Sequence, residues 1–141
     1  MSDLAAQIGS RRTWQTTVRR EHTVPALPVA SPGLASMPEV LATPTLVAMA
    51  ECACAEHLAA LAGADVLSLG TEVQIAHTAA TPVGMTVTLS TELAAVDGKL
   101  VTFAFTAHDG IDAAGHGRHT RAIVDRERFM QRLAEKRTRV G

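Results

Sequence analysis

The chain has 141 residues, of which 47% are hydrophobic and 19% charged, and its formal net charge is -1. This length fits one domain that buries a core without disulfide staples, and the apolar content excludes an intrinsically disordered chain. The lack of a run near ~18 apolar residues predicts no membrane-spanning helix, and the near-neutral charge predicts no nucleic-acid partner. We therefore expect a single domain over residues 1–141, with residues 1–10 disordered.

The N-terminal segment and the cysteines indicate a cytoplasmic protein. The first residues, MSDLAAQIGSRRTW, include an early acidic residue and no apolar stretch of the signal-peptide kind.

Cys52 and Cys54 lie two residues apart in a helical stretch, so they face different sides and no disulfide is expected. No zinc set surrounds them, and no metal is expected. Cys52 is a candidate nucleophile, although a small buried residue is its more ordinary role.

Basic residues gather at the two ends of the chain. Between His22 and Gly117 the only lysine or arginine is Lys99. Solvated surfaces are the ordinary explanation of such a distribution. The alternative is that the terminal arginines bind an anionic ligand, such as the phosphates of coenzyme A.

The first half of the chain predicts a strand, a long loop and a long helix. Residues 13–18 alternate as a strand does. Residues 21–40, EHTVPALPVASPGLASMPEV, hold four prolines and predict a loop without regular structure. Thr43-Pro44 predicts a helix start, with Thr43 as the N-cap, and Gly63 ends the helix. Small residues on all its sides predict that this helix is buried against a sheet.

The second half predicts antiparallel strands. Apolar residues alternate over 68–79, 85–93, 101–107 and 115–124, with turns at TPVG and Asp97-Gly98, and residues 126–137 predict a charged terminal helix. One sheet wrapped around one long central helix is the economical packing of these parts. This order is typical of the α+β hot-dog fold, which usually pairs into dimers.

Two polar residues interrupt the apolar faces of the predicted elements. Glu51 has apolar neighbours at helical spacing, and His77 lies on the strand face that should meet the helix. A solvent-facing glutamate and a satisfied core histidine are the bland interpretations. Together the two could form an acid/base pair, or a base with its orienting partner. Thr43 adds a hydroxyl at a helix N-terminus, where free amides suit a carbonyl oxygen.

The spacing of Thr43 and Glu51 constrains this hypothesis. Eight residues separate them, or ~12 Å of helix rise. They can serve one substrate if the helix starts late, if the substrate spans the gap, or if a second copy supplies one of them. Gly70 either brings a backbone amide close to a ligand or marks a bulge in the strand. Arg121 faces either water or a ligand. His116 and His119 lack the spacing of a helical metal site.

Three stretches carry a resemblance to a known family: PEVLATPTLVAMAECA, SLGTEVQIAHTAATPVGMTVT and AHDGIDAAGHGRHTRAIVDRERF. Over about residues 20–135 the chain resembles the fluoroacetyl-CoA thioesterase family of hot-dog enzymes. The resemblance implies hydrolysis of an acyl-CoA thioester at a homodimer interface, with no cofactor beyond the coenzyme A of the substrate. It implies catalytic roles for Thr43, Glu51 and His77, and places Gly70 and Arg121 beside the substrate.

One departure from the family bears on specificity. The fluoroacetyl-specific member covers its acyl pocket with a phenylalanine pair, and the matching positions here are Leu34 and Met37. We therefore expect a short or functionalised acyl group and no fluoroacetyl specificity. Whether Glu51 attacks the thioester or activates water stays open, as does the choice between CoA and a carrier protein. The alternatives are a hot-dog hydratase or dehydratase, and a non-catalytic protein that binds an acyl thioester or a small molecule.

Overall fold

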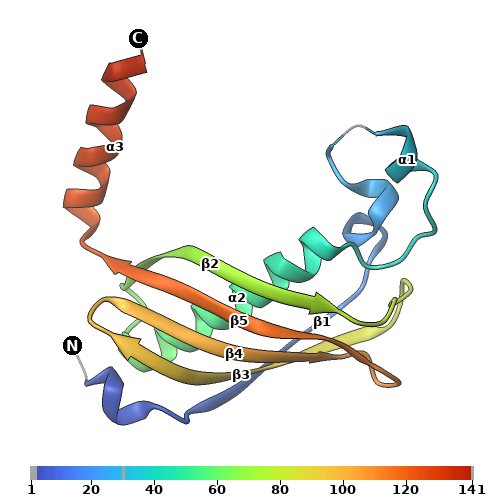
Figure 1. Cartoon of the computed structure of the whole chain (residues 1–141), viewed down its shortest axis with the longest axis horizontal. Helices are drawn as coiled ribbons and strands as arrows, with labels where there is room; N and C mark the ends of the chain where they lie inside the picture. The colour runs from blue at the N-terminus through green and yellow to red at the C-terminus, as the bar shows by residue number, and fades with distance from the viewer. Residues whose placement is uncertain (1–2, 30, 141) are drawn as a thin grey trace.

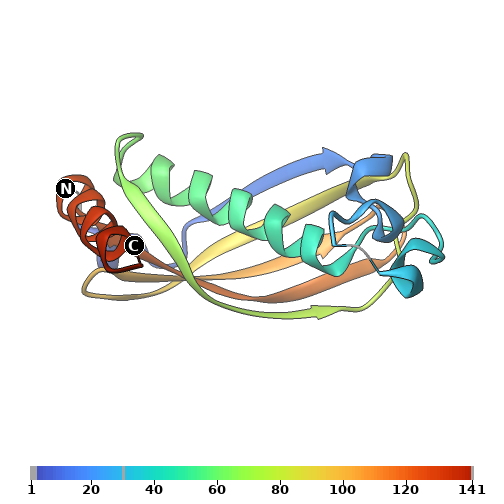
Figure 2. The ribbon, with the colours of Figure 1, turned by 90° about the horizontal axis from the view of Figure 1, so that it is seen from above.

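The fold is a single antiparallel sheet curled around one long helix. A computed structural model describes residues 3–29 and 31–140. The sheet has the order β1-β3-β4-β5-β2, and Figures 1 and 2 show it wrapping around α2. The strands are β1 (Arg11–Thr17), β2 (Leu67–His77), β3 (Thr86–Asp97), β4 (Leu100–His108) and β5 (Ala113–Val124), and the helix is α2 (Thr43–Ala62). The predicted hot-dog architecture is confirmed.

Helix α2 fills the concave side of the sheet because its side chains are small and apolar. Its N-terminal half buries Leu46, Met49 and Ala50 against Val87 and Phe105 of the sheet. Its C-terminal half packs against a second apolar cluster, which includes Cys54, Leu58, Leu93, Val101 and Phe103. Short side chains let the helix axis approach the strands closely, so one helix and one sheet make a continuous core.

The prediction that the chain holds no candidate membrane span needs a correction. Helix α2 has 20 residues and a mean hydropathy of 1.3 in its most apolar window, which is long and apolar enough to cross a membrane. The sequence prediction missed this candidate span because Glu51 and Glu56 interrupt the apolar run. The core helix of a globular domain meets the same criterion, and the burial of its side chains against the sheet accounts for its composition.

Three further sequence predictions differ from the structure. The N-cap of α2 is Ala42, and Thr43 is the first helical residue. The proline-rich segment holds short helices: η2 (Arg20–His22), η3 (Val24–Ala26) and α1 (Pro32–Ala35). Residues 3–10, predicted to be disordered, contain the turn η1 (Leu4–Gln7), which buries Leu4 in the core. Residues 1–2 of that prediction lie outside the described part of the chain.

Strand β2 is an edge of the sheet and carries a bulge. It pairs with β5 on one side, and the register shifts between Gly70 and Glu72, so that Thr71 is the additional residue. The middle of the strand, residues 71–74, is exposed. The bulge reverses the alternation of side chains. Gly70 and His77 therefore both face α2, although a difference of seven positions would place them on opposite faces of a regular strand.

The terminal helix α3 (Arg126–Val140) extends from the end of β5 and away from the sheet (Figure 1). It buries none of its described residues. It is three residues longer than predicted at its C-terminus.

Candidate functional site

The first polar group joins the start of α2 to the end of β2. The hydroxyl Oγ1 of Thr43 and Nδ1 of His77 are hydrogen-bonded at 2.8 Å. Burial lowers the pKa of His77, an effect that the backbone carbonyl of Ala79 opposes, so the ring is neutral near pH 7. Its other nitrogen, Nε2, is buried and has no hydrogen-bond partner in the described part of the chain. This nitrogen is therefore a buried polar atom that no described group of the chain satisfies.

A hollow of about 320 Å³ opens beside this pair. It is lined by Thr43 and His77 together with Val24, Val40, Leu41 and residues 78–80. The free amides of the first turn of α2 lie at the same end of the helix, where the helix dipole favours negative charge. The pair thus combines a neutral imidazole, a hydroxyl and a helix N-terminus around one hollow.

The second polar group surrounds Glu51, two turns further along α2. Nη1 of Arg121 donates to Oε1 of Glu51 at 3.4 Å. The other nitrogens of Arg121 donate to Ser68, with Nε 2.9 Å from its Oγ and Nη2 3.0 Å from its carbonyl oxygen. Arg121 is buried, with 8% of its surface exposed, whereas the side chain of Glu51 is 45% exposed. The guanidinium is thus fixed, and the carboxylate that it holds is open to a ligand.

Gly70 lies directly over this carboxylate. A Cβ atom at position 70 would overlap with Oε1 of Glu51 and would come within 3.0 Å of Cε1 of His119. Any side chain at this position would displace Glu51. The bulge hypothesis for Gly70 is confirmed, because the register shift begins at this residue, whereas an approach of its backbone amide to a ligand stays a prediction.

The structure does not bring all three predicted catalytic residues together within one copy. Thr43 contacts His77, whereas the partners of Glu51 are Arg121 and His119. Because α2 begins at Thr43, a late start of the helix does not close the gap of ~12 Å between Thr43 and Glu51. Two of the three explanations remain: a substrate that spans the gap, or a second copy of the chain that supplies one of the two residues.

The sequence analysis missed His119 as a member of the site. This side chain is 2% exposed and lies between Arg121 and the backbone of β2, with its Nε2 3.9 Å from Oε1 of Glu51. Its position two residues before Arg121 on a predicted strand was the available signal, since such residues share a face. His116, by contrast, is exposed.

The predicted lid residues and the thiols lie apart from these contacts. Leu34 is on α1 and Met37 follows it with 46% of its surface exposed, and neither is among the described residues that line the hollow beside His77. Cys52 is exposed rather than buried, while burial raises the pKa of Cys54 to about 12. Cys54 is therefore an inert thiol at neutral pH.

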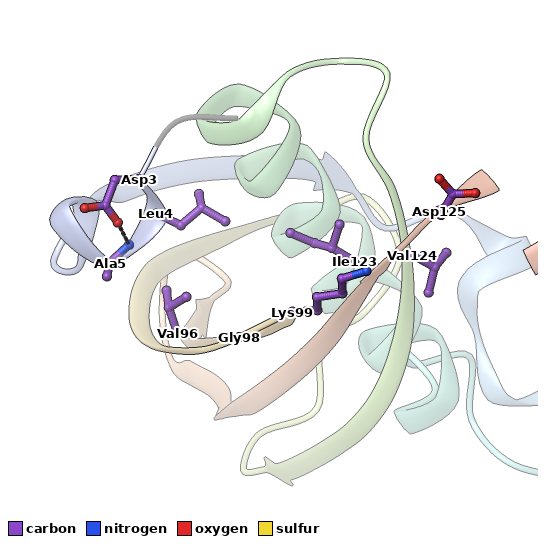
Figure 3. Close-up of a pocket in the computed structure, with 9 residues that line it drawn as sticks. All are labelled: Asp3, Leu4, Ala5, Val96, Gly98, Lys99, Ile123, Val124 and Asp125. Carbon is purple, nitrogen blue, oxygen red and sulfur yellow. Dashed lines mark hydrogen bonds between the residues drawn. The ribbon is translucent and has the colours of Figure 1, made fainter. Parts of the chain in front are cut away.

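A hollow of similar size lies at the opposite end of the sheet (Figure 3). It has a volume of about 370 Å³ and lies among η1, the turn between β3 and β4, and the end of β5. Apolar side chains such as Leu4 and Ile123 line it, with Lys99 as its one cation among the described lining residues. It contains none of the predicted site residues, so the candidate site is the one along α2.

Comparison with known proteins identifies the family of the chain. The family model described as fluoroacetyl-CoA-specific thioesterase matches residues 18–127. The fluoroacetyl-CoA thioesterase of Streptantibioticus cattleyicolor is 39% identical over 130 residues, which cover 92% of this chain and 94% of that protein.

Solved structures give the same result. A variant of the fluoroacetyl-CoA thioesterase in complex with acetyl-CoA superposes with a TM-score of 0.86 at 39% identity, covering 92% of this chain and 97% of that chain. A hot-dog-like protein from Thermanaerovibrio acidaminovorans, 21% identical, shares the fold with a TM-score of 0.78 and covers 92% of this chain and 91% of its own. On the family match and the identity together, the chain belongs to the fluoroacetyl-CoA-specific thioesterase family of hot-dog thioester hydrolases.

Proposed function

We propose that this protein hydrolyses a short acyl-CoA thioester at a site that two copies of the chain build together. The observation that carries the proposal is the division of the polar residues between two places on α2. One copy offers the Thr43–His77 pair at the helix start and Glu51 with Arg121 two turns later. Neither group alone holds both a carboxylate and an imidazole with an available nitrogen.

The exposed edge of the sheet supports pairing of two copies. Strand β2 has eleven residues, and its exposed middle presents unpaired backbone groups, which readily pair with another strand. Val73, in this stretch, is 38% exposed. In a two-fold symmetric dimer, antiparallel pairing of β2 with its copy places the Gly70 end of one strand beside the His77 end of the other. Glu51 of the partner subunit then lies near Thr43 and His77.

The proposed chemistry follows from these groups. The thioester carbonyl binds at the amides of the first turn of α2, with the Thr43 hydroxyl beside it, and its oxygen becomes negative as the carbon is attacked. Glu51 attacks that carbon or removes a proton from the attacking water. His77 acts through Nε2 as the acid/base toward the intermediate and the leaving thiolate. If water attacks, the C–S bond breaks and the products are the carboxylic acid and the free thiol of coenzyme A. If Glu51 attacks, the thiol leaves first and the acyl group stays on Glu51 as a mixed anhydride, which water then hydrolyses to the carboxylic acid.

The acyl group is proposed to be short or functionalised, without specificity for fluoroacetyl. The support is the pair Leu34 and Met37, which are aliphatic where the fluoroacetyl-specific member has phenylalanines. The named relatives act on fluoroacetyl-CoA or are seen with acetyl-CoA, and both carry a two-carbon acyl group. The terminal arginines are the proposed contacts for the phosphates of coenzyme A, and the cytoplasm is the proposed location.

The test is release of free thiol from a panel of short acyl-CoAs, which includes acetyl-CoA and fluoroacetyl-CoA. We expect the parent protein to release thiol, and we expect Glu51→Gln and His77→Ala each to lower kcat by ~100-fold or more with an unchanged circular dichroism spectrum. Binding without thiol release would support the non-catalytic alternative. Formation of a hydrated product without thiol would support the hydratase.

The same panel tests the lid hypothesis. Replacing Leu34 and Met37 together by phenylalanine is expected to narrow the accepted acyl groups, because aromatic rings would fill the space over the acyl chain. The readout is the ratio of kcat/KM between the best and the longest acyl-CoA that the parent accepts. An unchanged ratio would mean that α1 does not cover the acyl group.

A further inference from the structure

His119 is a buried histidine whose two ring nitrogens are both engaged. It lies on β5 opposite Phe103 of β4, and 2% of its surface is exposed. Its Nδ1 is 2.8 Å from the backbone carbonyl oxygen of Glu72 on β2. A carbonyl oxygen only accepts, so Nδ1 carries the hydrogen and donates it.

The second ring nitrogen of His119, Nε2, accepts a hydrogen bond. Nη1 of Arg121 lies 3.0 Å from Nε2 of His119, and a guanidinium only donates. A hydrogen on Nε2 would point at this donor, so the contact requires the neutral ring with a lone pair on Nε2. The carbonyl that accepts from Nδ1 belongs to Glu72, the residue at which the register of β2 resumes after the bulge.

Arg121 is thereby held from every side. Ser68 accepts from Nε and Nη2, while His119 and Glu51 both accept from Nη1, at 3.0 and 3.4 Å. Ser68 fixes one edge of the planar guanidinium, and His119 fixes the nitrogen that contacts the carboxylate. Without an acceptor at Nε2 of His119, Nη1 would lose its shorter hydrogen bond, and the 3.4 Å contact with Glu51 would be its one remaining hydrogen bond in the described part of the chain.

We propose that His119, as its Nδ1–H tautomer, is a positioning residue that orients Nη1 of Arg121 toward Glu51 and the substrate. This inference rests on the proposed function, because it assigns His119 a part in the turnover that Glu51 performs. Nε2 of His119 lies 3.9 Å from Oε1 of Glu51, beyond hydrogen-bond distance, so its effect on turnover is assigned to its contact with Arg121.

A double-mutant cycle tests this dependence. His119→Phe, which keeps a ring and removes both nitrogens, is expected to lower kcat/KM about tenfold or more in the parent protein. In the Arg121→Ala background the same change is expected to cost less than about twofold, because the group that His119 orients is gone. Equal losses in both backgrounds would overturn the proposal.

Two further variants separate positioning from folding. His119→Gln offers an amide oxygen to Nη1 and is expected to retain kcat/KM within about threefold of the parent. His57→Gln, a change at the buried histidine on the other side of α2, is the matched control and should lower stability by the same amount, and kcat/KM by the same factor, in both Arg121 backgrounds. If His119→Gln loses as much kcat/KM as His119→Phe at equal melting temperature, the proposal is wrong.

A spectroscopic measurement keeps the test independent of turnover. Nitrogen-15 NMR of the histidine rings, with His119 assigned from the spectrum of His119→Gln, is expected to show a protonated Nδ1 and an unprotonated Nε2 at pH 7. A protonated Nε2 would contradict the proposal whatever the activity. A parent protein that releases no thiol from any acyl-CoA would reject the proposed function, whereas a working parent with an additive cycle would reject the role of His119 alone.

Discussion

The burial of each side chain in the candidate site determines what that side chain can do. Burial lowers the pKa of His77, which keeps the ring neutral, and Nε2 has no hydrogen-bond partner in the described part of the chain, as the proposed role of proton carrier requires. Glu51 keeps nearly half of its side chain exposed, which lets it reach a ligand while Arg121 holds it. These properties arise from position on the fold and not from the residue types.

Gly70 gives the sharpest prediction for a single position. Gly70→Ala would place a Cβ atom against Oε1 of Glu51, so the carboxylate must move from Arg121. We expect kcat to fall by about tenfold or more, as a displaced catalytic group costs, measured by thiol release.

Gly33→Ala is the matched control for this substitution. The Cβ added at Gly33 would meet Ser31 Oγ at 3.8 Å, which is ordinary contact, so kcat should stay within about twofold of the parent. If Gly70→Ala turns over like the parent, the observed position of Glu51 is not the one used in catalysis.

The elements were largely predictable, because hydrophobic period and turn residues report on local structure. The expected strand at 101–107 is β4, and the expected helix ending at Gly63 is α2. The short helices of the proline-rich segment were not predictable, since elements of three or four residues are too short to show a hydrophobic period.

The candidate site was predictable only in part. Sequence spacing identifies Thr43, Glu51 and His77 as unusual, but it places Gly70 and His77 on opposite faces of a regular strand. The bulge at Thr71 is a property of pairing with β5, and it alone brings both residues to the face that meets α2. His119 looked ordinary in the sequence because its acceptor is the backbone carbonyl of Glu72 on another strand, a contact that the pattern of residue types does not report.

Helix α2 is also tied to the strands by a buried histidine on its far side. Nδ1 of His57 is hydrogen-bonded to the Thr91 hydroxyl of β3 at 2.8 Å, and Nε2 lies 3.1 Å from the hydroxyl of Ser10 before β1. Burial, and after it the charge of Arg12, lower the pKa of His57 below its ordinary value of 6.5. The folded protein therefore holds this ring in its neutral form.

This linkage predicts a loss of stability in mild acid. Below pH 6.5 the unfolded chain takes up protons that the folded protein rejects at His57, so the free energy of unfolding falls as the pH decreases. His77 and His119, whose pKa values burial also lowers, act in the same direction. We expect the urea midpoint to fall between pH 7.5 and 5.5, and the fall to be smaller in His57→Gln. An equal pH dependence in the two proteins would contradict the assignment to His57.

At the scale of the whole molecule, one chain divides what a thioesterase site needs between two places. The family match establishes the kind of enzyme, and the geometry of a single copy leaves Glu51 apart from Thr43 and His77. The edge strand β2 is the surface through which a second copy is proposed to close this separation. A shared site of this kind makes activity depend on dimer formation.

Complementation between two inactive variants tests this central claim most directly. Glu51→Gln and His77→Ala are each expected to lack activity, and dimers that contain one copy of each are isolated with two different affinity tags. If Glu51 of one copy serves His77 of the other, one of the two sites in the mixed dimer is intact, and thiol release recovers to about half of the parent rate. If the residues act within one copy, no site is intact, and a mixed dimer without activity would contradict the account.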